Sequence, residues 1–179
     1  MRKIVLLLLF GLTGVFSPSF SQLAQAQAVD LAPADAGFLN DAAQAGIAEI
    51  AASRLAQRKA TRPETRAFAE QMLADHAGLA EALKQLAAQK QVELPTEATA
   101  LQKAKLAVVE AGDATKFDAR YVRAFGVDAH EDAVLLFQQA SRNVRDPDVR
   151  SFALKNLPML RQHLEMARRL VAGTAVSAR

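Results

Sequence analysis

The sequence of 179 residues predicts an all-α protein, an antiparallel bundle of four long helices with a long crossover that carries a short extra helix. Three observations support this fold class. From about residue 34 onward, apolar residues, many of them alanine, recur at the three- and four-residue steps of an α-helix. Glycine and proline fall mostly between these periodic segments. No stretch shows the alternation of apolar and polar residues that is typical of a β-strand.

Two long helices are predicted in the first half of the chain. The first begins near Asp35 and reaches about Ala60, and one of its faces consists of Phe38, Ala42, Ala45, Glu49, Ala52 and Ala56. The second begins at Pro63, which suits the first helical turn because no backbone N–H is needed there, and reaches about Lys90. Its inward stripe consists of Phe68, Met72, His76, Leu79, Leu83 and Leu86.

Two further long helices follow the crossover. A shorter helix is expected over 96–111, between the break at Pro95 and the stop at Gly112. The third long helix is predicted over 116–143, and the fourth extends from the N-cap Asp146 to about Val171. The fourth helix begins with PDVRSFA, which is similar to the PETRAFA at the start of the second helix. Similar packing environments are therefore expected at the two helix starts. Either an internal duplication or a shared way of starting a helix explains the similarity.

The N-terminal residues are typical of a secretory signal peptide. Two basic residues precede an apolar run, and Ala26-Gln27-Ala28 fits the small-x-small pattern of a signal-peptidase site. We therefore predict a signal peptide over 1–28, a helical domain over 29–173, a frayed tail over 174–179 and a periplasmic location. Cleavage two residues earlier is one alternative. A membrane anchor is another, but the apolar run is shorter than the roughly 20 residues of a spanning helix, so the cleaved protein is not expected to span the membrane.

Composition narrows the classes of site further. The chain has no cysteine, which excludes a disulfide framework, thiolate metal ligands and covalent haem attachment. The formal net charge of +3 includes Arg2 and Lys3, so the chain after them carries +1. Nucleic acid is therefore not an expected partner. The arginines on and before the last helix are expected to form a solvated face that pairs with nearby acidic residues.

Three histidines are the residues with the clearest potential for chemistry. They are the only histidines in the sequence, and His76, His130 and His163 each fall on the inward face of a different long helix. Glu49 interrupts the otherwise apolar face of the remaining helix. At about 1.5 Å rise per residue, Glu49, His76 and His130 fall within roughly 3 Å of their helix midpoints, and His163 roughly 5 Å beyond its own. The four side chains are therefore expected to share one layer of the bundle.

Such a layer has two interpretations. Isolated polar groups in an apolar core cost several kcal/mol, so all four groups need partners. A single transition metal ion bound by Glu49, His76, His130 and His163 would meet that need, and imidazole and carboxylate ligands favour iron or zinc. The alternative is a metal-free network in which these groups hydrogen-bond to one another, to hydroxyl or amide side chains, or to buried water.

Neighbouring residues allow further hypotheses. Asp75, Glu131 and Asp132 flank the histidines and would either orient them or remain solvated. The methionines at helical spacing are expected to fill the core and not to bind haem. The sequence contains no phosphate-binding loop and no nucleophile motif. It therefore assigns no catalysed reaction, and neither haem nor a nucleotide is an expected cofactor.

Several motifs resemble those of a known bacterial family: residues 36–39, 46–50, 66–69, 72–76, 117–121, His130 and residues 157–163. On these motifs, which extend over nearly all of the chain after the signal peptide, the sequence resembles the domain of unknown function 4142 family. The resemblance implies an exported protein with a ferritin-like four-helix fold and an uncharacterised activity. It does not imply di-iron chemistry, because ferritin-like di-iron sites use Glu-x-x-His motifs. Here Leu73, Val127 and Leu160 stand three residues before the histidines.

Two functions from different classes remain open. One is an exported ferritin-like bundle that binds a single transition metal ion for storage, sensing or redox protection. The other is a metal-free envelope protein that acts through protein–protein interaction or stress protection, in which the histidine cluster is structural.

Overall fold

The computed structural model describes residues 31–177, with side chains described to residue 173, and confirms the all-α fold class. Within these residues no strand is present. None of the helices in this part of the chain is both long and apolar enough to cross a membrane. The predicted signal peptide over 1–28 lies outside the described residues.

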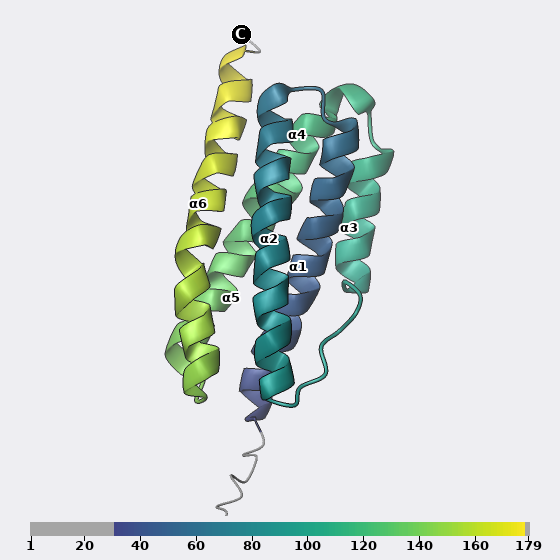
Figure 1. The fold of residues 1–179 in the computed structure, drawn as a ribbon. Helices are drawn as coiled ribbons and strands as arrows, with labels where there is room; N and C mark the ends of the chain where they lie inside the picture. The colour runs from purple at the N-terminus through teal and green to yellow at the C-terminus, as the bar shows by residue number, and fades with distance from the viewer. Residues whose placement is uncertain (1–30, 178–179) are drawn as a thin grey trace, which may run out of the picture.

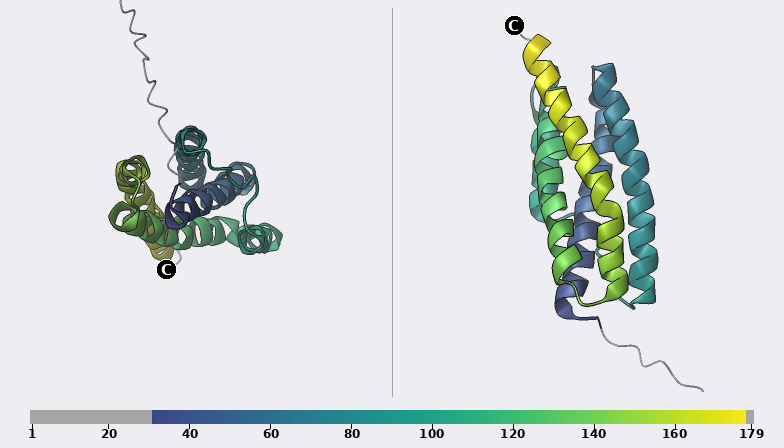
Figure 2. Two further views of the ribbon diagram at one scale, coloured as in Figure 1. Left: turned by 90° about the horizontal axis from the view of Figure 1, so that it is seen from below. Right: turned by 90° about the vertical axis from the view of Figure 1, so that its left-hand side faces the viewer.

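Long antiparallel helical segments form the bundle, and a shorter helix stands beside them (Figure 1). In chain order the elements are α1 (Pro33–Lys59), α2 (Pro63–Gln89), α3 (Ala100–Ala111), the turn η1 (Ala114–Lys116), α4 (Phe117–Tyr121), the π-helical segment η2 (Val122–Asp128), α5 (Ala129–Asn143) and α6 (Pro147–Ser177). The segments α4, η2 and α5 run on from one another as one long rod. The short helix α3 lies at the outer edge of the bundle next to α1 and α4 (Figure 2). The predicted crossover with a short helix is therefore present.

Two boundaries differ from the sequence-based prediction. The helix α3 begins at Ala100, four residues later than predicted, because Thr99 caps it. The Thr99 hydroxyl accepts from the Gln102 amide at 3.1 Å, and the Gln102 side chain accepts from the Thr99 amide at 2.8 Å. At the other end of the chain, α6 continues past Val171 to Ser177. A glycine such as Gly173 costs a helix only about 1 kcal/mol relative to alanine, so it does not end one by itself.

The predicted third helix is interrupted by a π-helical segment. Within η2 the amide of Ala129 donates to Ala124 O, five residues earlier, where an α-helix would use Phe125 O. Gly126 lets this segment approach α6 closely, since a Cβ atom there would lie 2.8 Å from the Cβ of Ala167. Such π-helical segments are frequent at functional sites.

A buried aspartate holds the link between α1 and α2. Asp118, at the start of α4, accepts from the backbone amides of Thr61 at 3.1 Å and Arg62 at 3.2 Å. The Arg66 guanidinium in turn donates to Ala60 O at 2.7 Å. These contacts satisfy polar backbone groups that the end of α1 and the start of α2 leave without helical partners.

The link between α5 and α6 is held in the same way. Asp35, at the start of α1, accepts from the amides of Arg145 at 3.0 Å and Asp146 at 2.7 Å. The Arg150 guanidinium donates to Val144 O at 2.6 Å, six residues earlier, as Arg66 does to Ala60. The similar packing environments that the PETRAFA and PDVRSFA motifs predict are therefore present, and the two halves of the bundle are held by equivalent contacts.

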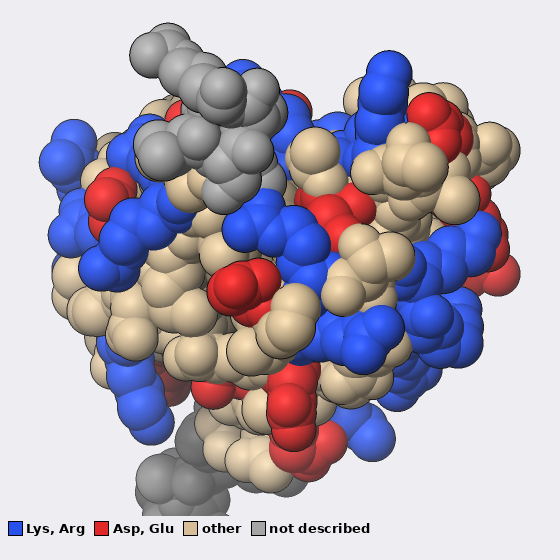
Figure 3. Space-filling model, turned by 90° about the horizontal axis from the view of Figure 1, so that it is seen from above, with Lys and Arg blue, Asp and Glu red and all other residues tan. Residues whose placement is uncertain are grey.

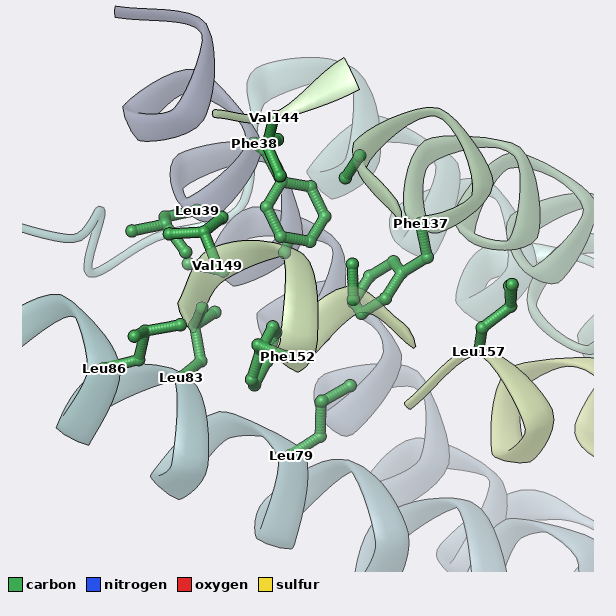
Figure 4. Packing of buried hydrophobic residues seen from close by; sticks show 14 of the residues in the cluster. Phe38, Leu39, Leu79, Leu83, Leu86, Phe137, Val144, Val149, Phe152 and Leu157 are labelled. Atoms are coloured by element: carbon green, nitrogen blue, oxygen red, sulfur yellow. The ribbon is translucent and has the colours of Figure 1, made fainter. Parts of the chain in front are cut away.

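Two apolar clusters fill the bundle, one toward each end. In the first, the ring of Phe38 packs edge to face on that of Phe137, with centroids 5.1 Å apart, and Phe137 lies 6.0 Å from Phe152 at a tilted angle (Figure 4). The second surrounds Phe68 and Tyr121, whose centroids are 6.2 Å apart. Each histidine follows a residue of one cluster and precedes a residue of the other along its helix. The histidine layer therefore lies between the two clusters.

Basic and acidic side chains mix on the surface. Figure 3 looks down on the end of the bundle that carries the α1–α2 link, where Lys and Arg lie beside Asp and Glu. On α6, Arg168 contacts Glu131 at 3.0 Å and Glu165 at 2.9 Å. This arginine therefore belongs to a paired, solvated face, as predicted.

Candidate metal centre

The four residues that the sequence singles out lie together in the buried centre of the bundle. Glu49 is 3% exposed, and His76, His130 and His163 are 1%, 0% and 1% exposed. The three imidazole rings are mutual neighbours, with centroids 5.3 to 5.4 Å apart. One nitrogen from each ring lies within 4.8 Å of the other two. The three histidines therefore form a group that could hold a metal ion, with Glu49 beside it.

The π-helical segment orients His130. Because the Ala129 amide donates to Ala124 O, it does not donate to the Phe125 carbonyl as it would in an α-helix. The Phe125 carbonyl instead contacts His130 Nδ1 at 3.0 Å. A carbonyl oxygen can only accept, so Nδ1 carries the proton of the neutral ring and donates it. The Nε2 atom of His130 then holds a lone pair and lies 3.3 Å from Nε2 of His76.

His163 is oriented by an acidic residue near the surface. Its Nε2 donates to Asp75 Oδ2 at 2.9 Å, and the Asp75 side chain is about a third exposed, at 36%. The Nδ1 atom of His163 is buried and has no hydrogen-bond partner among the described residues. Of the acidic residues that flank the histidines in sequence, Asp75 therefore orients a ring, whereas Glu131 pairs with Arg168 at 3.0 Å.

Glu49 lies beside the Nδ1 atoms of both His76 and His130. Its Oε2 lies 3.1 Å from His76 Nδ1, and its Oε1 lies 3.6 Å from His130 Nδ1. Despite this proximity, neither Glu49 Oε1 nor His76 Nδ1 makes an aligned hydrogen bond within the described part of the chain. Glu49 thus contacts the imidazole nitrogens that face away from the His76–His130 contact.

Burial makes the charged forms of these groups unfavourable. It raises the pKa of Glu49 to about 8, although the nearby Lys105 ammonium opposes the shift. Burial lowers the pKa of His130 to about 4, assisted by His163. It also lowers the pKa of His76 well below the ordinary value, with smaller contributions from His130 and His163. Without a bound ion, Glu49, His76 and His130 are therefore mostly uncharged at neutral pH.

Further polar residues beside the centre were not found by sequence reasoning. The Tyr121 hydroxyl lies 3.1 Å from the Ser53 hydroxyl, and burial raises the pKa of Tyr121. The Phe125 carbonyl is a second example, and no feature of the sequence reveals which carbonyl a π-helical register leaves free. Ser53 falls four residues after Glu49, so its place on the same helix face could have been recognised.

Comparisons with known proteins agree with this fold. Among curated proteins, no match to the chain was found. Among solved structures, the chain is similar to the crystal structure of a DUF305 fragment from Deinococcus radiodurans, with a TM-score of 0.70 and 11% sequence identity. That similarity covers 79% of this chain and 97% of the other, and at such low identity it shows the fold alone. The family model described as Domain of unknown function (DUF4142) matches residues 20–170, which is most of the sequence, so the chain belongs to the DUF4142 family.

Proposed function

We propose that this protein binds one divalent transition metal ion through Nε2 of His76, Nε2 of His130 and Nδ1 of His163. The orientation of the rings carries the proposal. The outer nitrogens of His130 and His163 donate to the Phe125 carbonyl and the Asp75 carboxylate, and His76 turns Nδ1 toward Glu49. Metal-binding histidines typically donate the N–H of their second ring nitrogen to a carboxylate or a backbone carbonyl in this way.

The spacing of the inner nitrogens supports the same proposal. Two nitrogens bound to one ion at about 2.05 Å and at a tetrahedral angle lie roughly 3.3 Å apart. The Nε2 atoms of His76 and His130 are 3.3 Å apart. Because the whole set spans 4.8 Å, His163 would move slightly inward on binding. A fourth position would remain for water or another small ligand, as in three-histidine zinc sites.

In this proposal Glu49 stabilises His76 from outside and is not a direct ligand. The sequence-based hypothesis included it among four ligands, and that role stays a prediction. Zinc and ferrous iron suit a site of neutral imidazoles with a carboxylate nearby. Because of the predicted signal peptide, we place this function in the periplasm. There the protein would store, sense or buffer the ion.

A metal-free function is the second candidate, and one observation favours it. A protonated Glu49 could donate to His76 Nδ1, His76 Nε2–H to His130 Nε2, and His130 Nδ1–H to the Phe125 carbonyl. Such a chain of hydrogen bonds gives each of these polar groups a partner, although the contact between Glu49 and His76 is poorly aligned. The histidine layer would then be structural, and the protein would act in the envelope through a protein partner.

Elemental mass spectrometry separates the two candidates. The protein is produced with its own N-terminal leader and without a histidine tag, purified from the periplasm, and compared with a His130→Gln variant. The metal-binding function predicts close to one zinc or iron per chain in the wild type and a large loss in the variant. A wild-type protein that contains no metal and does not bind added Zn²⁺ or Fe²⁺ would favour the metal-free function, in which the histidine layer is structural.

A further inference from the structure

A cleft connects the protein surface with the buried polar layer. Its volume is about 290 Å³. It is lined by residues of α1, η2 and α5 and by the N-terminal part of α3. Glu49 forms part of its wall, and Glu49 Oε1 is buried without a hydrogen-bond partner among the described residues. Phe125, whose carbonyl orients His130, lines the same cleft. The cleft therefore reaches the groups that surround the three histidines.

The charges along this cleft are arranged unevenly. Asp41 of α1 and Asp132 of α5 line it, and both are exposed. Neither forms an ion pair with any residue in the described part of the chain, whereas Glu110, Asp148 and Glu131, which are also exposed, do. Lys105 of α3 is the one basic residue in the lining, and its Nζ lies 5.8 Å from the centroid of the Phe125 ring. Two exposed carboxylates, Asp41 and Asp132, thus share the cleft with a single ammonium group, and Glu49 lies at its buried end.

We propose that this cleft is the route by which a divalent cation enters the centre, with Asp41 and Asp132 attracting the ion and Lys105 opposing its passage. The inference rests on the proposed metal-binding function. Clefts lined by one sign of charge raise the local concentration of the opposite ion and speed association by about 10- to 1,000-fold. An ammonium group on the path acts in the opposite direction. The rate of metal uptake is therefore set by charges that do not touch the bound ion.

Stopped-flow mixing with Zn²⁺ and a chromophoric chelator measures the uptake rate. The double variant Asp41→Asn, Asp132→Asn is expected to take up Zn²⁺ about three- to tenfold more slowly at low ionic strength, and Lys105→Gln faster by a similar factor. Both effects shrink in 1 M salt, where charges are screened within about 3 Å. A double variant on α2, Glu70→Gln, Glu81→Gln, changes the net charge by the same amount at exposed positions away from the cleft and leaves the rate unchanged.

A steric block tests the route without changing the charge of the cleft. Because the chain has no cysteine, a Gln44→Cys variant carries a single thiol in the cleft wall, and a bulky uncharged maleimide can be attached there. The adduct is expected to slow uptake at least tenfold while the final stoichiometry stays the same. The same adduct on an Ala80→Cys variant, on the exposed face of α2, should have no effect.

The outcomes separate this inference from the proposed function. Suppose that the Gln44→Cys adduct, the Asp41→Asn, Asp132→Asn variant and the Lys105→Gln variant all take up Zn²⁺ at the wild-type rate and still bind one ion per chain. This result would overturn the route alone, and the surface near Asp75 would be the next route to test. A wild type that binds no Zn²⁺ at equilibrium would overturn the proposed function and the route together.

Discussion

The Nε2 atoms of His76 and His130 lie 3.3 Å apart in the buried centre of the bundle. His130 donates Nδ1–H to the Phe125 carbonyl, so a neutral His130 presents a lone pair to His76. If His76 also presents a lone pair, the two acceptors repel each other unless a cation lies between them. If His76 carries its proton on Nε2, the contact becomes an N–H···N hydrogen bond. The proton position on His76 therefore differs between the two candidate functions.

The pH dependence of metal affinity follows from this difference. Without metal, Glu49 is protonated below its pKa of about 8. With metal on Nε2, the His76 proton moves to Nδ1 and faces an ionised Glu49, so one proton is released per ion bound. Between pH 6.5 and 8 the Kd for Zn²⁺ should fall about tenfold per pH unit. Calorimetry in buffers of different ionisation enthalpy counts the released proton.

A Glu49→Gln variant provides the control for that measurement. Glutamine can accept from His76 Nδ1 but has no proton to lose, so its Kd should vary much less with pH in the same window. If wild type and variant show the same slope, the released proton comes from another group and not from Glu49.

Metal binding should also raise the thermal stability. A ligand at 100 times its Kd stabilises the native state by about 2.7 kcal/mol, which for a chain of this length corresponds to a Tm increase of roughly 5 to 10 °C. Mg²⁺, which prefers oxygen ligands, should give no shift. Differential scanning calorimetry of the wild type and His130→Gln tests this, and an equal shift in the variant would place the ion elsewhere.

The metal-free protein should be most stable near pH 6.5. The lowered pKa values of His76 and His130 mean that the unfolded chain binds more protons as pH falls below 6.5, which destabilises the native state. The raised pKa of Glu49 acts in the opposite direction, because the native state holds its proton from pH 4.5 to about 8 and loses that advantage as pH rises. Above pH 6.5 only the Glu49 effect remains, at up to about 1.4 kcal/mol per pH unit.

Urea denaturation in the presence of EDTA at pH 5, 6.5 and 8 measures this profile. Glu49→Gln should remove the decline between pH 6.5 and 8 and keep the decline toward pH 5. A wild type whose free energy of unfolding rises steadily to pH 8 would show that Glu49 is ionised in the native state.

The sequence was sufficient for the architecture and for the members of the polar layer. The helical period and the chain breaks predicted the bounds of α1 and α2 to within two residues. Pro63 marks the start of α2, and the apolar stripes mark the extent of both helices. The three histidines and Glu49 could be placed in one layer because inward position and depth follow directly from helix geometry. The repeated PETRAFA and PDVRSFA motifs correctly indicated equivalent helix starts, whose basis is the Arg66 and Arg150 contacts.

The orientation of the rings could not be predicted from the sequence. The ring orientation of His130 depends on the π-helical register of η2. The pattern of apolar residues in Val122–Asp128 does not distinguish a π-helical from an α-helical register. Ring orientation also depends on contacts across the bundle, such as Asp75 with His163, 88 residues apart. Helix periodicity says which residues face inward, but it does not say which imidazole nitrogen faces a neighbour.

Removing the Asp75 carboxylate should weaken metal binding. An Asp75→Ala variant leaves His163 Nε2–H without its acceptor at 2.9 Å, so the ring no longer holds Nδ1 toward the centre. Partners of this kind typically contribute 10- to 100-fold to metal affinity. Competition titration with a zinc chelator measures the change. Glu131→Ala removes an acidic residue next to His130 that pairs with Arg168 instead, so it should change the Kd less than about twofold.

Asp35 and Asp118 should contribute equally to stability, although they lie at opposite ends of the bundle. Each accepts from two backbone amides of the opposite helical link, and each is buried, at 1% and 7% exposure. Asp118 also accepts from the Thr61 hydroxyl, whose exposed side chain can turn to water when the carboxylate is removed. Replacing either aspartate by alanine leaves partly buried amides unpaired, at up to about 1 to 3 kcal/mol each. We therefore expect Asp35→Ala and Asp118→Ala each to lower the free energy of unfolding by about 2 to 5 kcal/mol in urea denaturation. Asp148→Ala removes an exposed ion pair with Lys90 and should cost less than about 1 kcal/mol. A large loss in only one of the two buried variants would mean that the two links, despite their equivalent hydrogen bonds, do not support the bundle equally.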